Sequence, residues 1–145
     1  MKQIHILLIE DNEGDILLTT EALNEGKMLK TITIMKDGWE GIQFLERNGK
    51  YSNSSLPDLI LLDVNLPKMN GHEVLRSIKM NEKIKHIPVI MLTTSSSERD
   101  ILLSYQNYVN CYMTKPVEVN NFLDVVSSIE NYWISMAQLP GNINI

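Results

Sequence analysis

Five residues with reactive side chains stand directly after short apolar runs in this sequence. Glu10 and Asp11 follow the first run, and Asp63, Thr93 and Lys115 follow three later ones. In an open parallel α/β sheet all strands point the same way, and ligands bind in the crevice outside their carboxyl ends. If the runs are strands of one such sheet, three carboxylates, a hydroxyl group and an ammonium group should therefore meet at one edge.

A cluster of the carboxylates of Glu10, Asp11 and Asp63 is best explained by a bound cation. Two like charges about 4 Å apart repel each other by roughly 4 kcal/mol at an effective dielectric constant of 20, so such a cluster is costly without one. Mg²⁺ prefers oxygen ligands from a few carboxylates and leaves its other positions to water and phosphate. We therefore expect a magnesium site here.

Asp63 has the chemistry of a phosphoryl acceptor. A carboxylate can attack phosphorus to form an acyl phosphate, and this transfer requires mainly positioning and charge neutralisation from the protein. Lys115 can supply the positive charge, and the hydroxyl of Thr93 can donate a hydrogen bond to a phosphate oxygen. A cis bond before Pro116 would direct Lys115 inward, but the sequence leaves the isomer of this bond open.

Strand and helix patterns alternate along the chain, which favours βαβ units and a doubly wound parallel sheet. The first, third and fourth apolar segments are nearly continuous, as expected of strands covered by helices on both faces. Asn12 can cap the first helix through its side chain. We expect strands at residues 3–9, 31–35, 59–62, 88–92 and 110–113, and helices at 12–26, after 38, after 71, from about 98, and at 122–136.

Length and composition limit the class of protein. The 145 residues fit one domain, which we place at residues 1–136, followed by a short tail at 137–145. Thirteen Lys and Arg against 18 Asp and Glu give a net charge of −5, the opposite of a nucleic-acid-binding protein. The single cysteine and the absence of a long apolar stretch predict a soluble cytoplasmic protein without a direct membrane partner.

Simpler interpretations exist for each of these residues. Glu10 and Asp11 could be an acidic pair favoured by a helix dipole, and Asp63 could be an ordinary turn residue. Lys115 could be a solvated surface lysine. Thr93 could belong to a polar helix entry, and Tyr112 could be ordinary core packing. The acidic residues and Lys115 all follow predicted strands of one parallel sheet. This shared position favours the site over these alternatives.

The segment 62–71, read together with Glu10-Asp11, Thr93 and Lys115-Pro116, resembles the receiver domains of two-component response regulators. The resemblance implies a flavodoxin-like sheet of strand order 2-1-3-4-5 with five helices. It also implies that Mg²⁺ binds to Glu10, Asp11, Asp63 and the backbone carbonyl of Asn65. A sensor histidine kinase would phosphorylate Asp63, and the only reactions catalysed would be the protein's own phosphorylation and dephosphorylation.

The same resemblance implies a switch. Thr93 and Lys115 would bind the phosphoryl group, and Tyr112 would be the aromatic switch residue. Phosphorylation adds about −1.5 to −2 charges, after which Thr93 would move toward the new oxygens and Tyr112 into the vacated space. The face formed by the fourth helix, fifth strand and fifth helix would then change shape.

A narrower resemblance, to the stand-alone regulators that serve bacterial phytochromes and related sensor kinases, rests on the long polar loop predicted at 48–57 before the third strand and on segments 104–112 and 130–140. Those proteins tend to dimerise through the face just described, so a homodimer is expected, and onward transfer to a histidine phosphotransfer protein is left open. Thr94 and Val117 depart from the common alanine and phenylalanine of the family. These departures leave the lifetime of the phosphorylated state undetermined.

Two other classes of protein share parts of this pattern. A haloacid-dehalogenase-like phosphatase also uses an aspartate nucleophile and Mg²⁺, but it requires a second aspartate where this chain has Asn65. A flavodoxin-type flavin carrier needs a phosphate-binding loop after the first strand. The acidic segment 10–15 would repel that phosphate.

Overall fold

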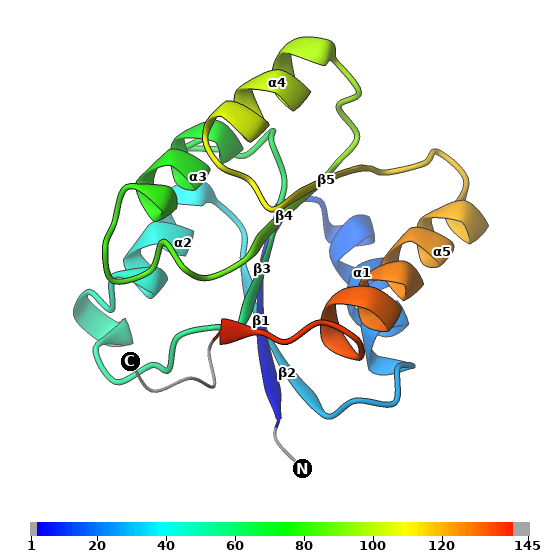
Figure 1. The fold of residues 1–145 in the computed structure, drawn as a ribbon, viewed down its shortest axis with the longest axis horizontal. Helices are drawn as coiled ribbons and strands as arrows, with labels where there is room; N and C mark the ends of the chain where they lie inside the picture. The colour runs from blue at the N-terminus through cyan, green and yellow to red at the C-terminus, as the bar shows by residue number, and fades with distance from the viewer. Residues whose placement is uncertain (1–2, 141–145) are drawn as a thin grey trace.

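A single five-stranded parallel sheet forms the centre of the computed structural model, which describes residues 3–140 (Figure 1). Its strand order is β2-β1-β3-β4-β5, so the predicted flavodoxin-like topology is confirmed. Each strand lies within one or two residues of its predicted position. The strands are β1 (Ile4–Ile9), β2 (Lys30–Met35), β3 (Leu59–Leu62), β4 (Val89–Thr93) and β5 (Cys111–Thr114).

Five α-helices cover the two faces of the sheet. Helices α1 and α5 pack on one face, and α2, α3 and α4 lie on the other (Figure 1). Within the predicted polar loop before β3, residues Gly49–Tyr51 form a short 3₁₀ helix. The α-helices are α1 (Glu13–Asn24), α2 (Gly38–Leu45), α3 (Gly71–Lys79), α4 (Glu98–Gln106) and α5 (Val119–Ile129).

Alternation along the strands divides the core into two layers. Successive side chains of a strand point to opposite faces of a sheet, so Leu7 and Ile9 of β1 pack toward α2 and α3, while Ile6 and Leu8 pack toward α1 and α5. Strands β1, β3 and β4 are almost fully buried because helices cover both of their faces. Their continuous apolar sequences are therefore explained.

Side-chain caps fix where four of the helices begin. Asn12 accepts a hydrogen bond from the backbone N–H of Asp15, as the sequence predicts. Asp37 and Ser97 cap α2 and α4 in the same way, and Asn70 forms a capping box with Glu73 at α3. Each cap satisfies a backbone N–H that would otherwise lack a partner, and three of these helices begin next to strand ends at the predicted site.

The end of the fifth helix differs from the prediction. The α-helix ends at Ile129, and residues Glu130–Ile134 form a π-helical turn, so the regular apolar spacing expected up to Met136 is broken. Met136 is exposed as a result. At this point the buried side chain of Glu130 turns inward to Lys30, 3.4 Å away. The predicted tail at 137–145 lies outside the described residues from 141 onward.

No helix within residues 3–140 is both long enough and apolar enough to span a membrane.

Candidate functional site

Three carboxylates meet where β1 and β3 end. Glu10 and Asp11 follow β1, and Asp63 follows β3, whose Leu62 pairs with Ile9. One oxygen of each carboxylate lies within 4.8 Å of the others. Glu10 and Asp63 are buried, whereas Asp11 is exposed, so the cluster is open to solvent on the side of Asp11.

Glu10 is held rigidly at the base of the cluster. Its Oε2 accepts hydrogen bonds from the backbone N–H groups of Asp11, at 3.1 Å, and Asn12, at 3.2 Å. Its Oε1 contacts the ammonium group of Lys115. Burial raises the pKa of Glu10 to about 7, and the nearby charge of Asp63 acts in the same direction, while Lys115 opposes both.

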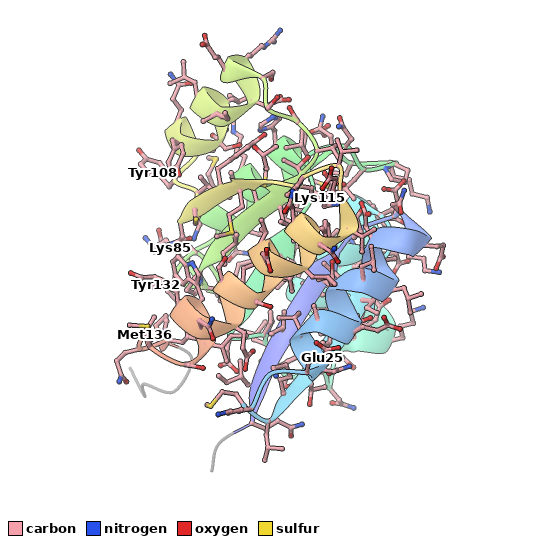
Figure 2. The ribbon with its side chains drawn as sticks, turned by 90° about the vertical axis from the view of Figure 1, so that its right-hand side faces the viewer. Glu25, Lys85, Tyr108, Lys115, Tyr132 and Met136 are labelled. Atoms are coloured by element: carbon pink, nitrogen blue, oxygen red, sulfur yellow. The ribbon has the colours of Figure 1, made fainter. Side chains whose placement is uncertain are left out.

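Lys115 follows β5 and lies near the start of α5 (Figure 2). Its buried ammonium group lies among the acids. Besides Glu10, its Nζ lies 3.0 Å from Oδ2 of Asp15 and 3.5 Å from Oδ2 of Asp63. Burial alone would lower the pKa of Lys115, but the hydrogen bond to Glu10 and the charges of the acids outweigh it and raise the pKa. Lys115 is therefore a fixed positive charge. Its peptide bond to Pro116 is trans.

Asp63 has an unused oxygen. Its Oδ2 faces Lys115, but its Oδ1 is buried without a hydrogen-bond partner among residues 3–140. A buried carboxylate oxygen without a partner costs free energy unless a ligand compensates for it. Since Glu10 and Asp11 add oxygens close by, the donor set fits a hard divalent cation such as Mg²⁺.

The loop after β3 carries Asn65, the predicted carbonyl ligand, which is exposed. The loop closes on itself because the backbone N–H of Gly71 donates to the carbonyl of Val64 at 2.7 Å. A side chain at Gly71 would overlap the carbonyl oxygen of Asp63. Glycine at this position thus lets the first turn of α3 pack directly against the backbone of the acceptor residue.

Thr93 lies buried at the end of β4, and its carbonyl accepts a hydrogen bond from the backbone N–H of Lys115 at 2.6 Å. Its Oγ1 accepts a hydrogen bond from the backbone N–H of Ser95 at 3.3 Å. Tyr112, half-buried in β5, donates its hydroxyl hydrogen to the carbonyl of Ser95 at 2.8 Å. The two predicted switch residues are therefore joined through Ser95.

Asp15 is a member of the site that sequence reasoning missed. The sequence alone does not indicate this role, because an acidic residue in the first turn of a helix is sufficiently explained by the helix dipole. The cap at Asn12 sets the position of Asp15 one turn into α1, where its carboxylate reaches Lys115. One signal in the sequence does exist: Asp15 follows Glu10 by five residues, which places it in the first turn of a helix that begins at the edge of the site.

The described geometry has close counterparts among known proteins. A family model for the response regulator receiver domain matches residues 6–127. The response regulator Rcp1 of Synechocystis is 44% identical over 135 residues, which cover 93% of this chain and 92% of that protein.

Solved structures agree with the sequence matches. The phosphorylated cyanobacterial phytochrome response regulator RcpA superposes with a TM-score of 0.94 at 45% identity, covering 96% of this chain and 99% of that one. The Mn²⁺-bound form of Rcp1 gives a TM-score of 0.93 at 43% identity, covering 94% and 99%.

Proposed function

Since the chain belongs to the response regulator receiver family, we propose that Asp63 is its phosphorylation site. As a receiver it is a two-component signalling protein phosphorylated on an aspartate, and it is not a conventional enzyme. A sensor histidine kinase is the partner that this family implies.

The observation that carries this assignment is the buried Oδ1 of Asp63, which has no hydrogen-bond partner among residues 3–140 and lies on the carboxylate that faces the ammonium group of Lys115. In the proposed reaction an oxygen of Asp63 attacks the phosphorus of a phosphohistidine. The P–N bond breaks, and its electron pair returns to the imidazole nitrogen, which is then protonated. Lys115 faces the developing negative charge, and the Thr93 hydroxyl donates to a phosphoryl oxygen.

Glu10, Asp11 and Asp63, with the backbone carbonyl of Asn65, are the residues that would hold Mg²⁺. When bound, the ion would neutralise charge on the phosphoryl oxygens. The buried Glu10 and the exposed Asp11 have different roles in this scheme. Glu10 is fixed by two backbone N–H groups, whereas Asp11 faces the solvent from which the ion enters. The Mn²⁺-bound form of Rcp1 supports a divalent ion at such a site.

We further propose that the partner kinase is a phytochrome-type sensor, because RcpA is a phytochrome response regulator at 45% identity. A histidine phosphotransfer protein is a second candidate partner of Asp63.

The output surface in this proposal is the face of α4, β5 and α5. Large apolar side chains are exposed there, and Figure 2 shows Tyr108 and Tyr132 along one side of the molecule. Exposed apolar side chains gathered on one face are typical of protein interaction sites. We propose that this face forms a homodimer; the exposed residues are Leu102, Tyr105, Tyr108, Val117, Val119 and Tyr132.

The proposal is tested by incubating the protein with Mg²⁺ and acetyl phosphate, followed by intact-mass measurement. We expect a gain of one phosphoryl group that requires Mg²⁺ and is absent in Asp63→Asn. The exposed Asp124→Asn is the matched control and should be phosphorylated normally. An equal mass gain in Asp63→Asn would place the phosphorylation elsewhere.

A further inference from the structure

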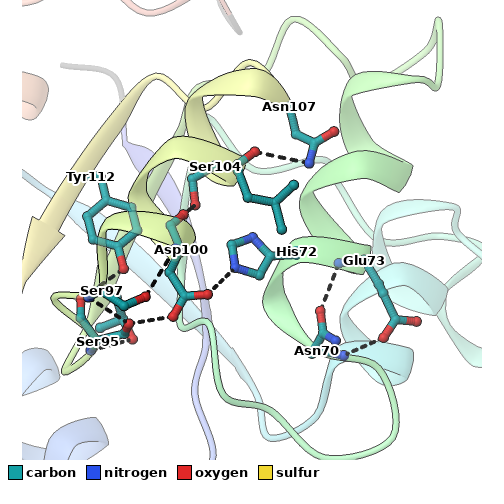
Figure 3. Close-up of polar contacts among 11 residues, drawn as sticks. Asn70, His72, Glu73, Ser95, Ser97, Asp100, Ser104, Asn107 and Tyr112 are labelled. Carbon is teal, nitrogen blue, oxygen red and sulfur yellow. Dashed lines mark hydrogen bonds and ion pairs between the residues drawn. The ribbon is translucent and has the colours of Figure 1, made fainter.

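Ser95, two residues after the predicted switch threonine, is the centre of a hydrogen-bond network outside the acidic site (Figure 3). Its N–H donates to Oγ1 of Thr93, and its carbonyl accepts from the hydroxyl of Tyr112. Its own hydroxyl donates to Oδ2 of Asp100 at 2.5 Å. The N–H, the carbonyl and the hydroxyl of Ser95 therefore form hydrogen bonds with three different residues.

Asp100, in the first turn of α4, is fixed from several sides. Its Oδ1 lies 2.9 Å from Nε2 of His72. Its backbone N–H donates to the Ser97 side chain at 3.1 Å, and its carbonyl accepts from the Ser104 hydroxyl at 2.7 Å. The hydrogen bonds from Ser95 and His72 hold the pKa of Asp100 below its ordinary value. The carboxylate of Asp100 thus accepts hydrogen bonds from Ser95 and His72.

His72 connects this carboxylate to a different helix. Because ionised Asp100 can only accept, Nε2 of His72 must carry the hydrogen and donate it. The other ring nitrogen, Nδ1, is buried and has no hydrogen-bond partner within residues 3–140. The ring lies on the first turn of α3, directly after Gly71, which packs on the backbone of Asp63. His72 therefore ties α4 to the helix that follows the acceptor loop.

This chain of contacts determines what the Thr93 hydroxyl can do. Since Oγ1 of Thr93 accepts from the Ser95 N–H, the hydrogen of the hydroxyl itself remains available for donation. The side chain of Ser95 is anchored by its hydrogen bond to Asp100, which helps to hold Ser95 in this position. The same anchor keeps the carbonyl of Ser95 in place for Tyr112.

We infer that His72 and Asp100 are positioning residues of the phosphorylation switch, which act through Ser95 to orient the Thr93 hydroxyl and to hold Tyr112. Neither residue touches the acceptor carboxylate. This inference rests on the proposed function. Loss of the His72 hydrogen bond loosens the loop between β4 and α4, so a phosphoryl group on Asp63 meets a poorly aligned Thr93.

The test uses beryllofluoride, a phosphoryl mimic, titrated calorimetrically into the full chain with saturating Mg²⁺. His72→Phe keeps an aromatic ring but removes the donor, and Ser95→Ala removes the hydroxyl while it keeps the backbone groups. We expect each to weaken beryllofluoride binding about 3- to 10-fold, the range expected for one hydrogen bond. His72→Gln, which retains a donor, should recover part of the affinity, and the exposed His86→Gln should match wild type.

Two further measurements separate positioning from a general loss of structure. Binding of Mg²⁺ alone should be unchanged in His72→Phe, because the acidic cluster is untouched. In the double variant His72→Phe with Ser95→Ala, the two losses should not add, because both remove the same connection. Additive losses, a weakened Mg²⁺ affinity or wild-type beryllofluoride binding in His72→Phe would each overturn the inference.

The outcome also distinguishes this inference from the proposed function. If wild-type protein fails to bind beryllofluoride in the presence of Mg²⁺, the assignment of Asp63 fails. If wild type binds and His72→Phe binds equally well, only the role of His72 and Asp100 is rejected.

Discussion

Asp15 competes with the acceptor for the same cation. Its carboxylate lies 3.0 Å from the ammonium group of Lys115, closer than the 3.5 Å that separates Lys115 from Asp63. Lys115 also contacts Glu10, so we expect it to keep its position when Asp15 is removed. Asp15 therefore adds negative charge beside the proposed position of the anionic phosphoryl group.

We predict that Asp15→Asn binds beryllofluoride about two- to five-fold more tightly than wild type, the range for a partly exposed ion pair. The cause is the loss of one negative charge beside Lys115. Asp15→Glu preserves the charge and should resemble wild type in the same calorimetric titration. Weaker binding by Asp15→Asn would show instead that this carboxylate is needed to orient Lys115.

Asp11 offers a second prediction, about metal dependence. A ligand that binds only the folded state raises the unfolding temperature with its concentration. Added Mg²⁺ should therefore stabilise the wild-type protein in thermal unfolding, and a chelator should reverse the effect. Asp11→Asn, which removes the exposed ligand, should lose most of this response, whereas Asn12→Asp should keep it. A full Mg²⁺ response in Asp11→Asn would remove this residue from the metal site.

At the scale of elements, the buried ion pair of Lys30 and Glu130 joins β2 to the end of α5. The two side chains are 2% and 8% exposed. Nζ of Lys30 also donates to the carbonyls of Leu23 and Met28, each at 2.7 Å, and Oε1 of Glu130 accepts from the N–H of Met28 at 3.3 Å. The turn between α1 and β2 is thus held by α5.

We predict that Glu130→Ala lowers the free energy of unfolding by about 3 kcal/mol, because it leaves a buried ammonium group without its counter-ion. The exposed pair of Glu82 and Lys85 provides the control, since Glu82→Ala should cost less than about 0.5 kcal/mol. Urea denaturation measures both. Equal costs would mean that the buried pair contributes no more than a surface pair.

The same elements show why prediction from the sequence succeeded in part. The strands and the cap at Asn12 depend on patterns within a few residues, so the sequence predicts them directly. The π-helical turn at Glu130 could not be predicted in this way, because Glu130 pairs with Lys30, which lies 100 residues away in the sequence. The sequence around His72 has no spacing typical of a metal site. Its hydrogen bond to Asp100 forms only because the fold brings α3 and α4 together.

The topology of the sheet is sufficient to predict which residues meet at the acidic site. Parallel strands carry their carboxyl ends to one edge, so Glu10, Asp11, Asp63 and Lys115 were expected together, and the structure places them there. The orientation of Thr93 was beyond sequence reasoning, because it depends on the hydrogen bonds of Ser95. The functional roles of these residues remain predictions.

At the scale of the whole molecule, the exposed apolar residues of α4 and α5 bear on assembly. The net charge of −5 opposes self-association at low ionic strength. An apolar contact must therefore outweigh a general repulsion, and one added negative charge within the contact should be enough to abolish it. Leu102 on α4 is 60% exposed, and Leu17 on α1 is 56% exposed.

These two leucines allow a matched test of the proposed dimer. We predict that wild-type protein with Mg²⁺ and beryllofluoride sediments as a dimer, and that Leu102→Asp remains a monomer under the same conditions. Leu17→Asp changes the net charge by the same amount at a similarly exposed position on a helix outside the proposed dimer face, so it should dimerise like wild type. If both variants lose the dimer, the added charge alone is responsible; if only Leu17→Asp loses it, the contact involves α1 and the output surface must be reassigned.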